Sequence, residues 1–253
     1  MAFIVACASA SPGIAPGPVS APGGSAAQPT LPPPLVSPVS AKSVPRSGSW
    51  NFAYAPGTFS YAFTTNATIA PISDTTQRRV VPELSQTAII TISGTGDVQV
   101  VQPVIVTSAS CDSNATLATR AQAFIPKLPN HITAGDRWRD STTTSGCRGM
   151  IPAESTVISN YIAIGDTTLA NTVVLQIHRT DLLTASGEGT EGQHRILVTA
   201  KGTGAADLFL DVASGRFVHA INTQTSLVNV NASGRLTQFV QHVTESISIT
   251  APR

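Results

Sequence analysis

Alternation of apolar and polar residues with a period of two is the feature of this 253-residue chain that most limits its fold. Ala88, Ile90 and Ile92 occupy one phase of a run, while threonine and serine dominate the other phase. Leu208 and Leu210 continue the same alternation near the C-terminus. Such a pattern is typical of antiparallel strands with one buried and one solvated face. We therefore expect an all-β, mainly antiparallel fold.

Glycine-containing turns are expected to separate these strands. The tetrapeptide Ala-Ser-Gly-Arg occurs at residues 213–216 and again at 232–235, each time between β-branched runs, and it predicts two hairpin turns. Gly-x-Gly at residues 94–96 and 202–204 resembles fragments of phosphate-binding loops, but hairpin turns are the better interpretation. The stretch from residue 155 to 250 is predicted to be a meander of six or seven strands.

One segment, residues 113–124, is predicted to be helical. Asp112 or Ser113 can cap it, and Leu117, Ala121 and Phe124 follow the i, i+4, i+7 spacing of a helix face. A short helix among some ten strands fits a curled sheet or half-barrel around one helix, or a sandwich with a helical connection. The sequence leaves both architectures open.

The N-terminal part differs from the rest in composition. Ten of the eighteen prolines precede Ser47, and no acidic residue occurs before Asp74. A stretch without a periodic apolar face cannot offset the entropy lost on ordering, so residues 8–46 are predicted to be a disordered tether. We expect residues 47–253 to form a single β-rich domain, and residues 1–7 to be the remnant of a signal peptide.

The charge balance argues against polyanionic partners. Fifteen basic and fourteen acidic residues give a net charge of +1, which predicts no binding of nucleic acid. No apolar run approaches the roughly eighteen residues that a membrane-spanning helix needs.

Residues 4–7, Ile-Val-Ala-Cys, resemble the lipobox of bacterial lipoproteins. In that family the cysteine becomes the acylated N-terminus and a Ser/Pro/Ala/Gly-rich spacer follows it, as it does here from Ala8 onward. The resemblance implies lipid attachment at Cys7, a membrane as a partner, and a periplasmic or outer-membrane-anchored location. A signal peptide needs a basic region and an apolar stretch of about 7 to 15 residues. We therefore expect the true start to lie upstream of Met1.

Two further cysteines, Cys111 and Cys147, flank the predicted helix. In an exported chain we expect them to form a disulfide, which leaves Cys7 as the odd cysteine for lipid attachment. Two buried free thiols are the alternative. Zinc binding is disfavoured because no C-x-x-C or H-x₃-H set accompanies these cysteines. We expect neither a metal site nor a cofactor.

The domain also resembles a second group of proteins. The segment LPNHITAGDRWRDS, a later Cys-Arg-Gly, a strand with Tyr161 and a closing D-x-x-x-G-R hairpin resemble uncharacterised exported β-domains of bacterial lipoproteins. They are similar in pattern to periplasmic carriers of lipids or lipoproteins, in which a curled sheet surrounds a helix. This resemblance implies a binding role and assigns no binding residue.

The sequence contains no recognisable catalytic constellation. The metalloprotease, nucleophile-elbow, phosphate-loop and dinucleotide motifs are all absent. His131 is the one histidine near carboxylates, Asp136 and Asp140, and its segment more plausibly forms a turn that anchors Trp138. Asp207 and Asp211 lie opposite Leu208 and Leu210 and are expected on a solvated face, without the ligand cluster that calcium requires.

Glu245 is the most unusual residue of the last predicted strand. It shares its phase with Val243, Ile247 and Ile249, so it falls in the apolar row. A lone buried carboxylate is strongly disfavoured, and Glu245 must be paired, protonated, or displaced to solvent. A protonated Glu245 in an open cavity would mark a ligand site. We favour pairing or displacement, because a strand near the end of a chain often lies at a sheet edge.

These observations predict a non-enzymatic, exported protein with a binding or structural role at the cell envelope. One alternative is a carrier that holds a hydrophobic ligand, either a lipid or a lipoprotein, between a curved sheet and the 113–124 helix. Another is a hydrolase that uses dispersed residues. A cavity lined by aliphatic side chains would favour the carrier, and convergent histidine and carboxylate groups would favour the enzyme.

Overall fold

The computed structural model describes residues 48–102, 113–148, 151–191 and 193–250, which form eleven β-strands and one α-helix. The predicted tether, residues 8–46, lies outside these described residues. No helix in the described part of the chain has the length and apolar character to cross a bilayer. The elements in chain order are β1 Ser49–Asn51, β2 Gly57–Pro71, β3 Arg79–Ile92, β4 Val98–Gln102, α1 Ser113–Phe124, β5 His131–Thr133, β6 Arg137–Arg148, β7 Ile151–Leu169, β8 Thr172–Glu191, β9 His194–Asp211, β10 Arg216–Ala232 and β11 Arg235–Ile249.

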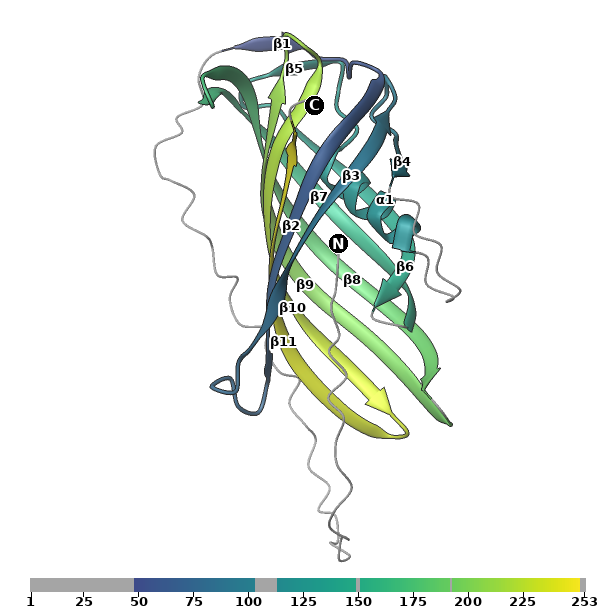
Figure 1. The fold of residues 1–253 in the computed structure, drawn as a ribbon. Coiled ribbons are helices and arrows are strands. Elements are labelled where there is room, and N and C mark those ends of the chain that lie inside the picture. Colours follow the sequence, from purple (N-terminus) through teal and green to yellow (C-terminus); the bar gives the residue numbers. More distant parts are fainter. Residues whose placement is uncertain (1–47, 103–112, 149–150, 192, 251–253) are drawn as a thin grey trace, which may run out of the picture.

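Nine of the strands form one antiparallel sheet in the order β4-β3-β2-β11-β10-β9-β8-β7-β6. The sheet curls into a half-barrel, in which β2 and β11 pair although they are far apart in the sequence (Figure 1). β1 and β5 form a separate two-stranded ribbon at one end of the half-barrel (Figure 1). The predicted all-β antiparallel fold is confirmed, and the curled sheet is the architecture adopted.

The helix α1 lies between the two edges of the curled sheet. It contacts β4 at one edge and β6 at the other, and Figure 1 shows it beside both strands. The predicted helix coincides with α1, and Leu117, Ala121 and Phe124 are buried, as their spacing predicts. The helix therefore covers the gap that the sheet leaves between its edge strands.

The main hydrophobic core fills the space between the helix and the concave face of the sheet. Tyr61 and Phe63 of β2, Phe217 of β10 and Ile177 of β8 belong to the same buried cluster as Phe124. A second, smaller cluster lies on β8, β9 and β10. Because the apolar face of α1 rests on packed side chains, the helix position is fixed by burial as well as by polar contacts.

The C-terminal meander contains five long strands, β7 to β11, and not six or seven. The predicted turn at residues 202–204 is wrong, because Gly202 and Gly204 lie inside β9 and pair with both β8 and β10. A Cβ atom on Gly202 would lie 2.5 Å from the carbonyl oxygen of Thr225. Glycine at this position therefore permits the close approach of β10 and does not mark a turn.

The other predicted turns are confirmed. Gly215 and Gly234, in the repeated tetrapeptide, have φ of +65° and +86° and connect β9 to β10 and β10 to β11. Gly96 has φ of +84° in the turn between β3 and β4. All three adopt a left-handed backbone that glycine reaches at little cost.

The last strand, β11, does not lie at an edge of the sheet. It pairs with β10 on one side and with β2 on the other. The expectation that this strand lies at a sheet edge is therefore wrong, and displacement of Glu245 to solvent at such an edge does not occur. β2, the second strand of the chain, pairs with β11, the last one. This long-range pairing cannot be predicted from local alternation.

Candidate functional site

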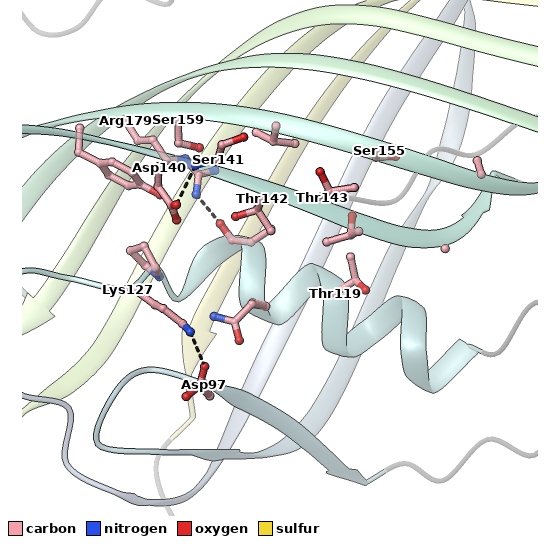
Figure 2. Close-up of a pocket in the computed structure, with 18 residues that line it drawn as sticks. Asp97, Thr119, Lys127, Asp140, Ser141, Thr142, Thr143, Ser155, Ser159 and Arg179 are labelled. Carbon is pink, nitrogen blue, oxygen red and sulfur yellow. Dashed lines mark hydrogen bonds and ion pairs between the residues drawn. The ribbon is translucent and has the colours of Figure 1, made fainter.

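A cavity of about 440 Å³ lies between α1 and the β6–β8 end of the half-barrel. Figure 2 shows Thr119 and Lys127 on the helix side, with Thr142 and Ser155 on the strand side. Hydroxyl groups are the most frequent functional groups of its described lining. They belong to Thr119, Ser141, Thr142, Thr143, Thr144, Ser155, Ser159 and Tyr161.

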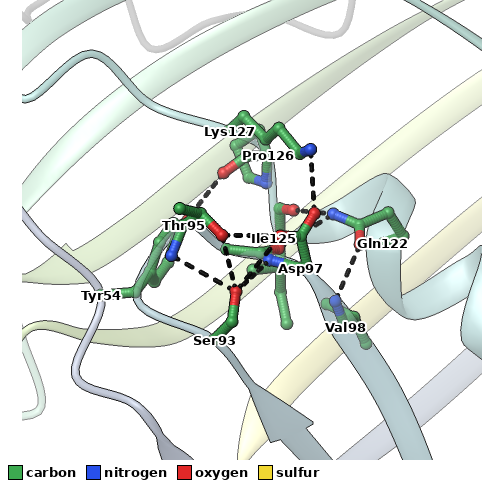
Figure 3. Close-up of polar contacts among 10 residues, drawn as sticks. Tyr54, Ser93, Thr95, Asp97, Val98, Gln122, Ile125, Pro126 and Lys127 are labelled. Carbon is green, nitrogen blue, oxygen red and sulfur yellow. Dashed lines mark hydrogen bonds and ion pairs between the residues drawn. The ribbon is translucent and has the colours of Figure 1, made fainter.

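Gln122 fastens the helix wall of the cavity to the β4 edge. Its side-chain oxygen accepts a hydrogen bond from the Val98 backbone N–H at 2.9 Å. Its amide nitrogen donates to the carbonyl oxygens of Gly96 at 3.0 Å and Ile125 at 2.8 Å (Figure 3). One side chain thus joins α1 to the β3–β4 turn and to its own C-terminal end.

Arg179 of β8 fastens the opposite side of the helix end. Its guanidinium donates a hydrogen bond to the carbonyl oxygen of Ala123 in the last turn of α1. The helix has no basic residue of its own in that turn. Arg179 therefore supplies the positive charge that the C-terminal end of a helix favours.

The inner end of the cavity is polar and contains a buried ion pair. Arg179 Nη2 lies 3.0 Å from Asp181 Oδ2, and both side chains are buried. The Ser159 hydroxyl donates to Asp181 Oδ1 at 2.6 Å. The Tyr161 ring stacks on Trp138 with centroids 5.2 Å apart, and burial raises the pKa of the Tyr161 hydroxyl. The charge of Arg179 at this end of the cavity is therefore balanced by Asp181, and the Asp140 carboxylate lies nearby (Figure 2).

The outer rim carries an exposed ion pair. Lys127 Nζ lies 2.8 Å from Asp97 Oδ1 (Figures 2 and 3). The hydrogen bond from Lys127, followed by that from Thr95, holds the pKa of Asp97 below its usual range. The positive charge of Lys127 at the rim is therefore balanced by the negative charge of Asp97.

The described lining of this cavity consists mainly of residues with hydroxyl, amide and charged groups. It includes neither histidine nor cysteine. A serine or threonine nucleophile needs a base within hydrogen-bond reach. Ser159 donates to Asp181, but that carboxylate is paired with Arg179, and Asp97 is paired with Lys127. Asp140 accepts a hydrogen bond from the Ser141 backbone N–H. No group of His, Cys, Asp or Glu that could hold a metal occurs among the described residues. Hydroxyl groups both donate and accept hydrogen bonds, so the lining suits a polar ligand.

Glu245 lies on the concave face of β11 and is buried. Its Oε1 is 3.3 Å from Nη2 of Arg120 on α1, and the Thr65 hydroxyl donates to it at 3.4 Å. Glu245 could be paired, protonated or displaced to solvent, and the structure shows it paired with Arg120. Glu245 is not among the described residues that line the cavity, and its role as a ligand carboxylate stays a prediction.

The sequence interpretation missed three buried charges, Arg120, Arg179 and Asp181. A signal for two of them was present, because Arg179 and Asp181 continue the phase of Leu175 and Ile177 along β8. Continuing the alternation of β8 past Ile177 would have predicted that Arg179 and Asp181 are buried. Arg120 gives no such signal, since the helix face it lies on becomes internal only when α1 meets the sheet.

The predicted cluster around His131 does not converge. The His131 ring contacts residues of β1 across the small ribbon. Asp136 accepts a hydrogen bond from the Thr133 backbone N–H in the turn before β6, while Asp140 lines the cavity. Trp138 packs on Tyr161, in agreement with a segment that anchors this tryptophan.

The remaining predicted residues have separate positions. Asp207 pairs with His178 at 3.0 Å, and Asp211 accepts hydrogen bonds from Ser214 in the turn before β10. Cys7 and Cys111 lie outside the described residues. Cys147 lies in β6, and its side chain is outside the described part. Lipid attachment and the disulfide therefore stay predictions.

Comparison with known proteins gives no family assignment. No family model matches the chain, and no curated protein matches it. Among solved structures, one match is OmpTdeltaL8, a loop L8 deletion mutant of OmpT, an outer membrane protein of Vibrio cholerae. That match covers 78% of this chain and 100% of the other, at 8% identity and a TM-score of 0.13. A similarity at this level carries no argument about fold or function.

Proposed function

We propose that this protein is a non-enzymatic binding protein of the bacterial cell envelope, attached to a membrane through Cys7. The proposed binding site is the cavity beside α1. The observation that carries this proposal is an open cavity of about 440 Å³ whose described lining is rich in hydroxyl groups. A cavity of this size falls in the range of small-molecule sites.

The character of the lining separates this proposal from its alternatives. A carrier of hydrophobic ligands needs an aliphatic lining, whereas twelve of the eighteen described lining residues here carry a hydroxyl or a charged group. A hydrolase needs a nucleophile beside a base. The carboxylate that accepts from Ser159, Asp181, is paired with Arg179, and Asp97 is paired with Lys127. Extraction of the purified protein with organic solvent tests the carrier. Lipid recovered in equimolar amount would favour the carrier over the proposed function.

The cavity is tested by filling it. Thr142 is exposed and lines the cavity, so Thr142→Trp places a bulky side chain inside it on a strand that tolerates aromatic residues. Ser145→Trp is the matched control, because Ser145 is also exposed on β6 but is not among the lining residues. A thermal-shift screen of sugars, polyols and capped dipeptides should find ligands for the wild type and Ser145→Trp. Ligands that stabilise Thr142→Trp equally would place binding elsewhere.

The membrane attachment has a separate test. The gene, with its upstream sequence, is expressed in a bacterium fed an alkyne-labelled fatty acid. We expect the label on the protein and in the membrane fraction, and the loss of both in Cys7→Ser. Label that persists in Cys7→Ser, or no label on the wild type, would contradict attachment at this residue.

A further inference from the structure

The cavity meets its two neighbouring strands in different ways. β7 contributes every second residue over much of its length, from Ala153 to Tyr161. β6 contributes Gly146 and five consecutive residues, from Asp140 to Thr144. Successive side chains of a strand point to opposite faces of a sheet, so every second residue means that the cavity covers one face of β7. Consecutive residues mean that it passes over the edge of β6.

β6 is the last strand of the sheet. In the described part of the chain it pairs only with β7. The backbone N–H of Ser141 donates to the Asp140 carboxylate at 2.7 Å and so is not used in the ladder with β7. Alternate residues of an antiparallel strand direct their N–H groups to the same side. The N–H groups of Thr143 and Ser145 therefore also face the edge.

This edge lacks the features that usually protect an edge strand. β6 is 12 residues long, contains no proline, and keeps an unbroken register with β7. Residues 141–147 carry no charge. By contrast, β4 at the other edge has five residues, and Gln122 binds its first N–H group. Natural sheets usually shorten, charge, kink or cover their edges, and along the cavity β6 is neither short, charged nor kinked, although α1 contacts it.

We propose that the edge of β6 binds an extended, uncharged segment of a partner polypeptide as an added strand between β6 and α1. This inference rests on the proposed function, because it names the ligand class of the same cavity. Backbone hydrogen bonds to β6 supply affinity, and contacts with the cavity walls select the side chains.

The far wall of the cavity decides which occupant fits. Thr119 and Ala123 of α1 line the same cavity as Asp140 to Thr144 of β6, so the helix bounds the space beside this edge. A second copy of this chain would bring its own β7 and helix with β6 and would meet α1, which argues against edge-to-edge pairing at this place. Small and hydroxyl side chains on both walls favour a segment with small, uncharged residues.

A capped nine-residue peptide of alternating serine or threonine and valine provides the probe. Its fluorescent form is titrated into the full-length protein and followed by anisotropy, beside the same peptide with methylated backbone nitrogens. Methylation removes the ladder hydrogen bonds and leaves the side chains. We expect the methylated peptide to bind at least about tenfold more weakly, since several hydrogen bonds of about 1 kcal/mol are lost. Equal binding of the two peptides would overturn strand addition and would leave the proposed binding cavity standing.

A protein variant tests the same contact from the other side. Thr143→Pro removes an N–H group that faces the edge, at a kind of position where proline is tolerated. Thr143→Ala keeps that group and serves as the control. We expect at least about a tenfold loss for proline relative to alanine. Equal affinities, or no peptide binding by the wild type, would refute the inference. If Thr143→Pro fails to fold, the methylated peptide alone decides, and the small-molecule screen with Thr142→Trp tests the cavity separately.

Discussion

At the scale of single residues, two buried ion pairs organise the interior of the half-barrel. Arg120 of the helix pairs with Glu245 of β11, and Arg179 pairs with Asp181 on β8. Removing one member of a buried pair leaves an uncompensated charge, which costs far more than the pair contributes. The two arginines also hold α1, one from within the helix and one at its last turn.

Glu245→Gln is predicted to destabilise the protein by about 3 kcal/mol, because it leaves the Arg120 guanidinium buried without a counter-charge. Urea unfolding at pH 7 measures the loss. The double change Arg120→Met with Glu245→Leu removes both charges and should recover most of the lost stability. A loss below about 1 kcal/mol for Glu245→Gln would show that solvent reaches the pair.

Acidification is predicted to destabilise the fold through two histidines. Burial lowers the pKa of both His219 and His242 below the usual value of about 6.5, and the nearby charge of Arg78 also lowers the pKa of His242. Below about pH 6.5 the unfolded chain therefore binds protons that the folded chain binds only at lower pH. The stability that these two histidines contribute should be fully present above about pH 6.5 and should be lost as the pH falls through their pKa values in the folded protein.

Urea midpoints measured between pH 7.5 and 5 test this dependence. The double variant His219→Gln and His242→Gln should show a smaller fall than the wild type. An identical fall in both proteins would assign the acid sensitivity to other groups.

The burial of Glu245 could be predicted from the sequence, but its partner could not. The period of two places Glu245 among buried residues, and it is buried. Arg120 lies on a helix far away in the sequence, and only the tertiary packing of α1 brings the two together. Local alternation reports which face a side chain takes, but not what lies opposite that face.

At the scale of elements, the two Ala-Ser-Gly-Arg turns show how context changes identical sequences. Both glycines have positive φ, yet their surroundings differ. A Cβ atom on Gly215 would lie 2.6 Å from the carbonyl oxygen of Ala53, whereas one on Gly234 would meet nothing within 4 Å. Gly215 serves both backbone conformation and close packing, and Gly234 serves conformation alone.

Gly215→Ala is therefore predicted to cost more stability than Gly234→Ala. The left-handed backbone alone costs a non-glycine residue about 1–2 kcal/mol, which is the loss expected for Gly234→Ala. The clash with Ala53 should raise the loss for Gly215→Ala to about 3 kcal/mol or more. Thermal or urea unfolding of both variants decides the order, and equal losses would contradict the packing difference.

The helix was predicted correctly and one glycine turn was not, because the first depends on local signals and the second on tertiary packing. The helix at residues 113–124 follows from spacing and capping, both of which are local. The glycines at 202–204 have the composition of a turn, but they lie within β9 because β10 needs close access to them. A turn glycine and a packing glycine differ in what lies opposite, and a single sequence does not contain that information.

At the scale of the whole molecule, α1 contacts both edges of the half-barrel, but the cavity lies beside only one of them. Gln122 of α1 binds β4, while β6 borders the cavity. This asymmetry could not be predicted from the sequence, because it depends on the pairing of β2 with β11. Strand alternation is common to all nine strands and does not reveal which of them end the sheet.

A disulfide between Cys111 and Cys147 is predicted to join the segment before α1 to β6 beside the cavity. Alkylation of the denatured protein before and after reduction, followed by mass spectrometry, measures it. We expect modification of both cysteines only after reduction, and a stability loss of roughly 4 kcal/mol for Cys111→Ser with Cys147→Ser. Modification without reduction would establish two free thiols.

The most direct test of the open edge is amide hydrogen exchange of the full-length protein without ligand, measured residue by residue by NMR. Thr143 and Ser145 should exchange rapidly because their N–H groups face the edge of the sheet, while Thr142 and Thr144 should be protected by pairing with β7. The central strand β10 should show protection at every residue that is paired on both sides. Protection of Thr143 and Ser145 equal to that in β10 would contradict an open edge, and with it the binding of a partner strand there.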